Sequence, residues 1–343
     1  MDDRIVLAHG GGGMLMRELI EKTIGPAIGG LPAEMPDAAP VPGADEFLMT
    51  TDSFVVKPLF FQGGDIGSLS VHGTINDLAV SGAEPLALSM AIIIEEGLEI
   101  AVLRRVLESA GAAARACGVR IVTGDTKVVA RGEADQLFIT TAGIGRRRAR
   151  LSAVAIRKGD ALILSGAIAE HGIAVMSARK GIEFSTPVRS DSASVWPLAK
   201  ALIESGAAVR VMRDPTRGGV SACVAELAEA AKVTVQIDEA ALPVSREVAG
   251  ACEMLGLDPL GVANEGKLIA FVASADAEKA VMALRAVAGG QRVGAGQGVA
   301  GGQNARVIGR AVARREKSAY LRTRFGGERI IEIPYGEELP RIC

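Results

Sequence analysis

Four aspartates in this sequence lie among small and hydroxyl residues, a setting in which carboxylates can reach a bound cation. They occur in the segments Thr50-Thr51-Asp52-Ser53, Ile75-Asn76-Asp77-Leu78, Thr123-Gly124-Asp125-Thr126 and Arg213-Asp214-Pro215-Thr216. Any one of them alone is more often a turn or helix-capping residue. Several carboxylates that converge favour Mg²⁺, which commonly binds protein carboxylates together with substrate phosphates. The set therefore predicts a site for magnesium and phosphate.

Two glycine turns could supply main-chain donors to such phosphates. The first is the run Gly10, Gly11, Gly12 and Gly13. A helical pattern follows it, so its N–H groups would lie at a helix N-terminus, where the dipole favours anions. By itself this run is equally consistent with an ordinary loop. The second turn, Gly218-Gly219, follows Asp214 and also precedes a helical pattern. The sequence contains no Walker motif, so the common route to nucleotide binding is absent.

Glu265 and Cys343 are candidates for acid-base and covalent chemistry. Glu265 directly precedes Gly266, Lys267 and an apolar segment at 268–272, where a carboxylate could act as a base. A glutamate at such a position is otherwise an ordinary surface residue. Cys343 is the last residue and ends a segment that contains proline and glycine, so its thiol is a nucleophile on a tether.

The other cysteines and the histidines do not indicate a further metal site. Cys117, Cys223 and Cys252 form no C-x-x-C spacing, which argues against a zinc site or a disulfide framework. The three histidines are not at ligand spacing, and we assign structural roles to them. A bound metal is therefore expected to be a hard cation held by oxygen.

The elements that must position these residues alternate between strands and helices. Hydrophobic periodicity predicts strands at 4–8, 46–56, 85–95, 120–123, 137–144, 160–165, 209–212, 233–237, 268–273 and 307–311. Helices are predicted after the first glycine run and at 69–83, 99–117, 171–179, 193–205, 220–232, 244–255 and 276–287. The prolines of 32–43 indicate a surface loop. This order of elements predicts an α/β (α+β) fold.

Two unusual segments divide this pattern. A basic run at 146–150 is interpreted as a solvated linker, and we place the domain boundary there. The predicted parts are an N-terminal domain at 1–151, a C-terminal α/β domain at 152–333 and a mobile tail at 334–343. The glycine-rich stretch 289–302 contains G-x-G-x-x-G, but a strand pattern follows it, which favours a flexible loop over a dinucleotide site.

The composition excludes several classes of protein. With 343 residues, of which 49% are hydrophobic, the chain can bury the cores of two domains. No segment reaches the ~18 to 20 apolar residues of a membrane span, and the N-terminus lacks the pattern of a secretory signal, so we expect a cytoplasmic protein. The net charge of −2 provides no field that favours nucleic acid or an anionic membrane.

These segments together resemble the hydrogenase expression/formation protein family HypE, which belongs to the superfamily of aminoimidazole ribonucleotide synthetase and selenophosphate synthetase. The resemblance spans essentially the whole chain. Its most specific part is the terminal Pro340-Arg341-Ile342-Cys343, because other members of the superfamily lack it. It implies a two-domain PurM-like fold whose N-terminal domain binds ATP and forms a homodimer, with sheet strands that pair between the subunits.

The activity that the resemblance implies is that of a carbamoyl dehydratase, which supplies the cyanide ligand of [NiFe]-hydrogenases. A partner carbamoyltransferase, HypF, would load a carboxamide onto the sulfur of Cys343. ATP would phosphorylate the carboxamide oxygen, and loss of phosphate with a proton from nitrogen would leave an S-cyanate. The cyanide would then pass to iron on the HypC–HypD complex.

The resemblance also implies roles for individual residues. Asp52, Asp77 and Asp214 would hold Mg²⁺, Lys127 would stabilise developing negative charge, and Glu265 would take the amide proton, with the modified Cys343 docked beside Lys127 and Glu265. The residues implied to bind ATP are Gly11, Gly12, Gly13, Thr51, Asp52, Asn76, Asp77, Asp125, Asp214 and Thr216.

Two other functions stay open at this point. One is a related enzyme that phosphorylates a free small molecule with ATP. Within that group, a selenophosphate synthetase would need a reactive cysteine or selenocysteine near the first glycine run, and none of residues 8–16 is one. The other is a carrier without catalytic activity that presents Cys343 to partner proteins, against which the aspartates and the glycine run argue.

Overall fold

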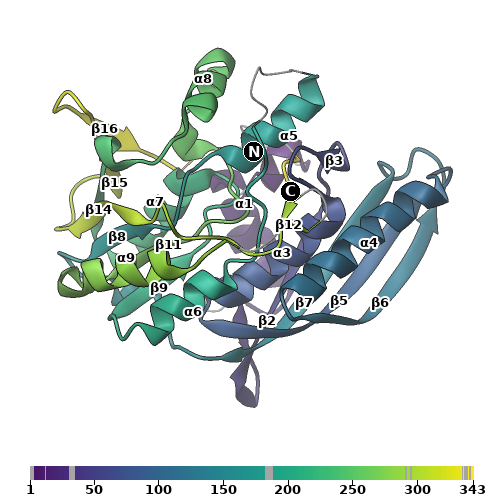
Figure 1. Cartoon of the computed structure of the whole chain (residues 1–343), viewed down its shortest axis with the longest axis horizontal. Coiled ribbons are helices and arrows are strands. Elements are labelled where there is room, and N and C mark those ends of the chain that lie inside the picture. The colour runs from purple at the N-terminus through teal and green to yellow at the C-terminus, as the bar shows by residue number, and fades with distance from the viewer. Residues whose placement is uncertain are drawn as a thin grey trace.

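Two sheets, one in each half of the chain, meet along a central helix (Figure 1). The computed structural model describes residues 4–11, 13–30, 35–181, 188–289, 292–293, 296–333, 335, 339 and 341–343. None of the helices in these ranges has both the length and the hydropathy that crossing a bilayer requires.

The first sheet has the strand order β1-β2-β7-β5-β6. Its strands are β1 (Ala39–Val41), β2 (Ala44–Phe54), β5 (Ala83–Glu95), β6 (Arg120–Val129) and β7 (Leu137–Arg147). Because successive side chains of a strand point to opposite faces, each strand serves both a helix-covered face and an outer face. Leu88 and Ile92 of β5 are buried on the helix-covered face, whereas Ile93 is 41% exposed on the outer face.

Two helices, α3 (Ile66–Val80) and α4 (Ile100–Ala116), cover the inner face of this sheet (Figure 1). The Asp65 carboxylate caps α3, because it accepts hydrogen bonds from the N–H groups of Gly67 at 2.8 Å and Ser68 at 3.1 Å. α4 is amphipathic and keeps its charged side exposed. α3 is buried on nearly all sides because it also contacts the second half of the chain, which places Asn76 and Asp77 between the two halves.

The second sheet has the strand order β16-β15-β10-β14-β8-β11-β9. Its strands are β8 (Ala161–Leu164), β9 (Val209–Arg213), β10 (Thr234–Asp238), β11 (Ile269–Val272), β14 (Arg306–Val312), β15 (Ala319–Arg322) and β16 (Glu328–Ile331). The surrounding helices are α5 (Glu170–Lys180), α6 (Trp196–Glu204), α7 (Gly219–Ala231), α8 (Arg246–Leu255) and α9 (Ala277–Ala286). β8 and β11 are buried on both faces, so they are continuous apolar runs without alternation.

Shorter elements complete the fold. The N-terminal segment forms η1 (Leu7–Gly10), α1 (Met14–Leu19), η2 (Ile20–Ile24) and α2 (Gly25–Ala27), and the hairpin β3 (Phe60–Phe61) and β4 (Gly64–Asp65) precedes α3. Single turns are η3 (Ala153–Ala155), η4 (Glu239–Ala241), η5 (Pro259–Gly261) and η6 (Ser274–Asp276).

Several predicted elements differ from the structure. The strand predicted at 4–8 is wrong, because this segment leads into the 3₁₀ turn η1. The surface loop predicted at 32–43 is wrong in part, because Ala39–Val41 form the edge strand β1, and residues 32–34 lie outside the described ranges. An edge strand tolerates Pro40, because its missing N–H group can face solvent. Within the glycine-rich stretch, β12 (Arg292–Val293) pairs with β13 (Gly296–Gln297), while residues 290–291 and 294–295 lie outside the described ranges. The basic run begins inside β7, and Arg148 forms an ion pair with Glu84.

Candidate active site

Three carboxylates approach one another where α3 meets the second half of the chain. Asp77 comes from α3, Asp214 from the turn after β9, and Asp37 from the segment before β1. One carboxylate oxygen of each lies within 4.8 Å of the others. Oxygen ligands at this spacing suit a hard divalent cation such as Mg²⁺. The geometric group shares Asp77 and Asp214 with the metal set predicted from the sequence and adds Asp37.

Burial and mutual repulsion raise the pKa values of these three carboxyl groups. Burial raises the pKa of Asp214 to about 8, and the neighbouring charge of Asp37 contributes to the increase. The pKa of Asp77 lies well above its ordinary value because of burial and the charges of Asp52 and Asp214. Burial raises the pKa of Asp37 even though Arg213 Nε lies 2.8 Å from its Oδ1. A bound divalent cation would relieve this repulsion, so the donor set fits Mg²⁺.

Asp52 lies beside this carboxylate group on the inner face of β2. A Cβ atom added at Gly73 of α3 would be 3.6 Å from Asp52 Oδ2, which shows that the aspartate faces the helix. Burial raises the pKa of Asp52, and the charge of Arg217 acts in the opposite direction. The neighbouring Thr50 hydroxyl, on the same face, donates to Asp77 Oδ2 at 2.8 Å.

Glu265 is held in place by hydrogen bonds to its main chain. The N–H groups of Glu265 and Gly266 donate to the two carboxylate oxygens of Asp191, at 3.2 and 3.1 Å. Asn76 Nδ2 donates to the carbonyl of Glu265 at 3.1 Å, and Asn76 Oδ1 accepts from Val195 N at 2.8 Å. The Asn76 amide therefore joins α3 to the segment that carries Glu265.

The side chain of Glu265 is only 3% exposed. Burial raises its pKa well above the ordinary value, and the charges of Asp214 and Asp191 add to this effect. Since a carboxylate with a raised pKa is a stronger base, this environment suits proton abstraction. The predicted position of Glu265 directly before β11 agrees with the structure, but the residue is buried and does not lie on the surface.

The end of the chain lies in the same region, at the centre of the view in Figure 1. The Val55 N–H, just after β2, donates to a main-chain carboxylate oxygen of Cys343 at 3.1 Å. Ile342 is 3% exposed and packs into the core of the N-terminal half. Negative charge at Cys343 is the main cause that raises the pKa of Arg217, whose guanidinium also interacts with the charges of Asp52 and Glu265. The charge of Arg217 therefore acts on both the terminal residue and the carboxylates.

The structure separates Lys127, Asp125 and Thr51 from this group. Asp125 and Lys127 pair in register with Ala91 and Ile93 of β5, so they belong to the outer face of the first sheet. Lys127 Nζ lies 2.7 Å from Asp125 Oδ2, and the two side chains are 66% and 60% exposed. Thr51 is exposed on β2, where its neighbours Thr50 and Asp52 point inward. A single chain therefore does not bring Lys127 to Glu265.

Arg217 contacts the first glycine turn. Its Nη1 donates to the carbonyl of Gly10 at 3.4 Å. Gly11 and Gly13 are buried, and Gly13 directly precedes α1, whereas Gly12 lies outside the described residues. The Thr216 N–H donates to the carbonyl of Asp214 at 3.0 Å, which forms the turn before α7.

Three residues of this arrangement, Asp37, Arg213 and Arg217, were not predicted from the sequence. Arg213 and Arg217 flank Asp214 in a segment that was recognised for that aspartate, so its position was the available signal. Asp37 is brought inward by its ion pair with a residue far along the chain. No local pattern indicates such a contact.

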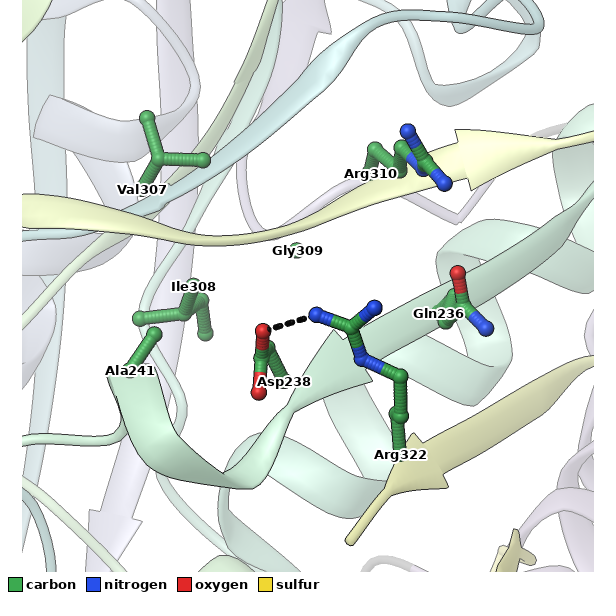
Figure 2. Close-up of a pocket in the computed structure, with 8 residues that line it drawn as sticks. All are labelled: Gln236, Asp238, Ala241, Val307, Ile308, Gly309, Arg310 and Arg322. Atoms are coloured by element: carbon green, nitrogen blue, oxygen red, sulfur yellow. Dashed lines mark hydrogen bonds and ion pairs between the residues drawn. The ribbon is translucent and has the colours of Figure 1, made fainter. Parts of the chain in front are cut away.

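A separate hollow of about 250 Å³ lies in the second sheet (Figure 2). An ion pair between Asp238 and Arg322 crosses it. The residues that line it are Gln236, Asp238, Ala241, Val307, Ile308, Gly309, Arg310 and Arg322. None of the residues predicted to be functional is among them.

Each half of the chain matches a known domain family. Residues 35–147 match the profile of the AIR synthase related protein, N-terminal domain, and residues 157–322 match that of the AIR synthase related protein, C-terminal domain. A carbamoyl dehydratase HypE of Rhizobium leguminosarum bv. viciae is 49% identical over 346 residues, which cover 99% of this chain and 95% of that protein. A carbamoyl dehydratase HypE of Escherichia coli K12 is 41% identical over 350 residues, or 99% and 100% of the two chains.

Solved structures are similar over most of the chain. A HypE chain in a HypE–HypF complex superposes with a TM-score of 0.84 at 41% identity and covers 92% of this chain and 99% of its own length. A hydrogenase maturation protein HypE in complex with ATP gives a TM-score of 0.80 at 38% identity, with 99% and 100% of the two chains covered.

Proposed function

The chain belongs to the carbamoyl dehydratase HypE family, and we propose that it uses ATP to convert an S-carboxamide on its own Cys343 into an S-cyanate. The observation that carries this proposal is the position of the chain end. Cys343 is bound by Val55, next to Arg217 and the carboxylates. A chain end that is held by Val55, within reach of the charge of Arg217, favours an enzyme that modifies its own tail over one that phosphorylates a free small molecule.

The proposed reaction begins with transfer of the γ-phosphoryl group of ATP to the carboxamide oxygen. This replaces a poor leaving group with phosphate. Departure of phosphate and loss of the two N–H protons then give R–S–C≡N, ADP and inorganic phosphate. Glu265 is proposed as the base, because it is buried beside the site and its pKa is raised. Arg217 would hold the negative charge of the terminal residue.

We propose that Mg²⁺ is held by Asp37, Asp77 and Asp214, with Asp52 next to them. One carboxylate oxygen from each of Asp37, Asp77 and Asp214 lies within 4.8 Å of the other two, and the pKa of each of the three is raised. When bound, Mg²⁺ would neutralise phosphate charge that these carboxylates would otherwise repel. Asp125, Thr216, Gly11, Gly12 and Gly13 remain proposed contributors to ATP binding.

The proposed partners follow from the same reaction. A solved relative is described as a HypE–HypF complex, and we propose that the carbamoyltransferase HypF loads the carboxamide onto Cys343. The cyanide would be delivered to iron on HypC–HypD for a [NiFe]-hydrogenase. The test is the intact mass of the C-terminal peptide after incubation with carbamoyl phosphate, ATP and HypF. Loss of one water from the carboxamide adduct is expected. An adduct that persists without ATP turnover would instead support a carrier.

We propose that the outer face of the first sheet forms a homodimer interface. It exposes apolar side chains on neighbouring strands, including Met49 (54%), Ile93 (41%) and Ile144 (38%). Lys127 and Asp125 belong to the same face, so a second copy is the proposed route by which they approach an ATP site. Exposed apolar surface of this kind is typical of interfaces.

Replacing Ile93 with lysine should convert the dimer into a monomer at micromolar concentration. A charge placed in the centre of the apolar outer face would be buried without a partner on association, which costs several kcal/mol. Analytical ultracentrifugation measures the result. Met282→Lys, at a position 64% exposed on α9, is the matched control and should remain dimeric. A wild-type protein that is monomeric under these conditions would contradict the interface.

Asp214→Asn is expected to stabilise the ATP-free protein while it weakens binding of Mg²⁺ and ATP. The folded-state pKa of Asp214 is raised to about 8, so the folded protein binds more protons than the unfolded one between the ordinary aspartate pKa of about 4 and pH 8. Stability must therefore fall as pH rises across this range and level off above about 8, and the asparagine variant should lack this decrease. The gain at alkaline pH should be about 1 to 3 kcal/mol, the cost of an unsatisfied buried group.

Urea unfolding at several pH values and calorimetry with ATP and Mg²⁺ measure the two effects. Asp77→Asn should behave in the same way, because burial also raises the pKa of Asp77. Unchanged ATP affinity in both variants would remove these residues from the proposed site. Asp238→Asn, at an exposed ion pair in the second sheet, is a control that should leave ATP affinity unchanged.

A further inference from the structure

His171 connects α5 to the end of the chain. Its side chain is completely buried, and its Nε2 lies 3.0 Å from the carbonyl oxygen of Ile342. Its Nδ1 lies 2.8 Å from Ser190 Oγ, and that hydroxyl oxygen accepts a hydrogen bond from Ser192 N at 3.0 Å. The Phe61 ring contacts the imidazole in an edge arrangement, with centroids 5.4 Å apart. Both ring nitrogens therefore have defined partners.

These contacts specify the proton arrangement of the imidazole. The carbonyl oxygen of Ile342 can only accept, so His171 Nε2 carries the proton and donates it. In the neutral ring Nδ1 is then an acceptor, and the Ser190 hydroxyl donates to it. Burial lowers the pKa of His171, which keeps the ring neutral and this tautomer in place. The ring is an oriented donor that points at the tail.

Arg179, two turns along the same helix, makes a second contact with the tail. Its Nη2 donates to the carbonyl of Arg341 at 2.6 Å, and its Nε donates to the carbonyl of Lys57 at 2.9 Å. Arg341 adopts a left-handed backbone conformation with φ of 54°, which is unfavourable for a side chain of this kind. Its own guanidinium donates to Val55 O at 2.9 Å and to Asp135 Oδ2 at 2.7 Å. The tail is thus bound in a defined conformation.

We propose that His171 and Arg179 form a clamp that holds the terminal tripeptide 341–343 in the active site and thereby positions Cys343 for dehydration. The inference rests on the proposed function for its purpose, although the contacts themselves do not depend on it. The two residues act through the tail backbone, so they are positioning residues and do not touch the reacting atoms.

The clamp binds only main-chain oxygens of the tail, so it can hold the tail at every stage of the reaction. His171 donates to the carbonyl of Ile342, Arg179 to the carbonyl of Arg341, and the Val55 N–H to the main-chain carboxylate of Cys343. These main-chain oxygens are the same whether the sulfur carries a proton, a carboxamide or a cyanate. The buried side chain of Ile342 supplies the remaining specificity, because a polar residue there would be desolvated. The clamp therefore recognises the tail independently of its chemical state.

The first test measures how readily Cys343 reacts with iodoacetamide in the purified full-length protein. His171→Met removes the donor with little change in volume, and Arg179→Met removes the second contact. Each should increase the alkylation rate at Cys343 about 2- to 10-fold, the shift in the docked equilibrium expected from one net hydrogen bond. His171→Gln can place an amide N–H near the position of Nε2 and should restore a rate close to that of wild type.

Matched controls separate the clamp from a general loosening of the fold. Ser177→Ala changes α5 only at a bond to its own backbone, because the Ser177 hydroxyl donates to the carbonyl of Ile173 at 2.7 Å. This variant should not alter alkylation of Cys343. The rate at Cys117, read from its own peptide in the same digests, should stay constant in all variants.

Faster alkylation of Cys343 in the two methionine variants would support the clamp. Wild-type alkylation rates in His171→Met and Arg179→Met would overturn it, and if His171→Met does not fold, Arg179→Met decides alone. The clamp variants should also slow S-cyanate formation while ATP affinity stays unchanged. If wild-type protein forms no S-cyanate at all, the proposed function fails, but the alkylation rates still decide whether the clamp exists.

Discussion

Cys343→Ala is expected to abolish formation of S-cyanate completely while the protein still folds and binds ATP with Mg²⁺. The variant loses only the sulfur that would carry the carboxamide. Two hydrogen bonds place the chain end, one from Val55 to the main-chain carboxylate of residue 343 and one from His171 to the carbonyl of Ile342. Both use main-chain atoms that alanine retains. The effect should therefore be confined to chemistry and should not extend to docking or nucleotide binding.

The measurement combines the mass of the C-terminal peptide with calorimetric ATP binding after incubation with HypF and carbamoyl phosphate. Cys117→Ala is the matched control. That thiol is half-buried, contacts the carbonyl of Gly298 at 3.5 Å, and has its pKa raised to about 11 by burial, so it is a poor nucleophile. Cys117→Ala should form S-cyanate normally. A carboxamide found on another residue of Cys343→Ala would contradict the assignment of Cys343.

The alternation of strands and helices could be predicted because most elements have strong local patterns. α4 lies within one residue of its predicted ends, and β11 was located correctly because it is a short apolar run next to turn residues. β9 was located from its valines and methionine, which lie before the turn at Asp214. β15 and β16 were not predicted. Each has only four residues, and β15 is stabilised by parallel pairing with the distant β10, which a local pattern does not reveal.

The end of β6 shows how tertiary pairing overrides propensity. The strand was expected to stop at Thr123, because glycine and aspartate are uncommon in strands. It continues to Val129, and Gly124 is required because a Cβ there would be 2.1 Å from the carbonyl oxygen of Met90 on β5. Asp125 is therefore inside an exposed edge strand and not at a strand end, which is why it does not join the carboxylate group.

The sequence predicted a carboxylate site for a divalent cation, but it did not identify all the residues that form the site. Asp77 and Asp214 were recognised from the small residues around them, and they do come together. Asp37 was overlooked because nearby prolines suggested a surface loop, whereas its ion pair with Arg213 turns it inward. His171 was assigned a structural role, since a lone buried histidine gives no indication that the end of the chain will pack against it.

Glu265→Gln is expected to accumulate the S-carboxamide on Cys343, with S-cyanate formation slowed about 10²- to 10⁴-fold, the typical contribution of a general base. ATP affinity should be retained, because glutamine keeps the size of the side chain and the main-chain hydrogen bonds to Asp191 and Asn76 do not involve it. Single-turnover mass spectrometry of the C-terminal peptide measures the rate. Glu229→Gln, on the surface of α7, is the control for the same substitution and should react normally.

The pH dependence distinguishes a base from a residue that only fills space. Burial raises the pKa of Glu265, and the base must be ionised, so the wild-type rate should decrease as pH falls through that raised pKa. Glu265→Gln should lack this decrease. The same shift means that ionising Glu265 destabilises the fold as pH rises, so the variant should be more stable than wild type at alkaline pH. A variant that is more stable and yet slower is the combination expected when a residue is kept for catalysis. A normal rate with an unchanged pH profile would assign proton abstraction to another group.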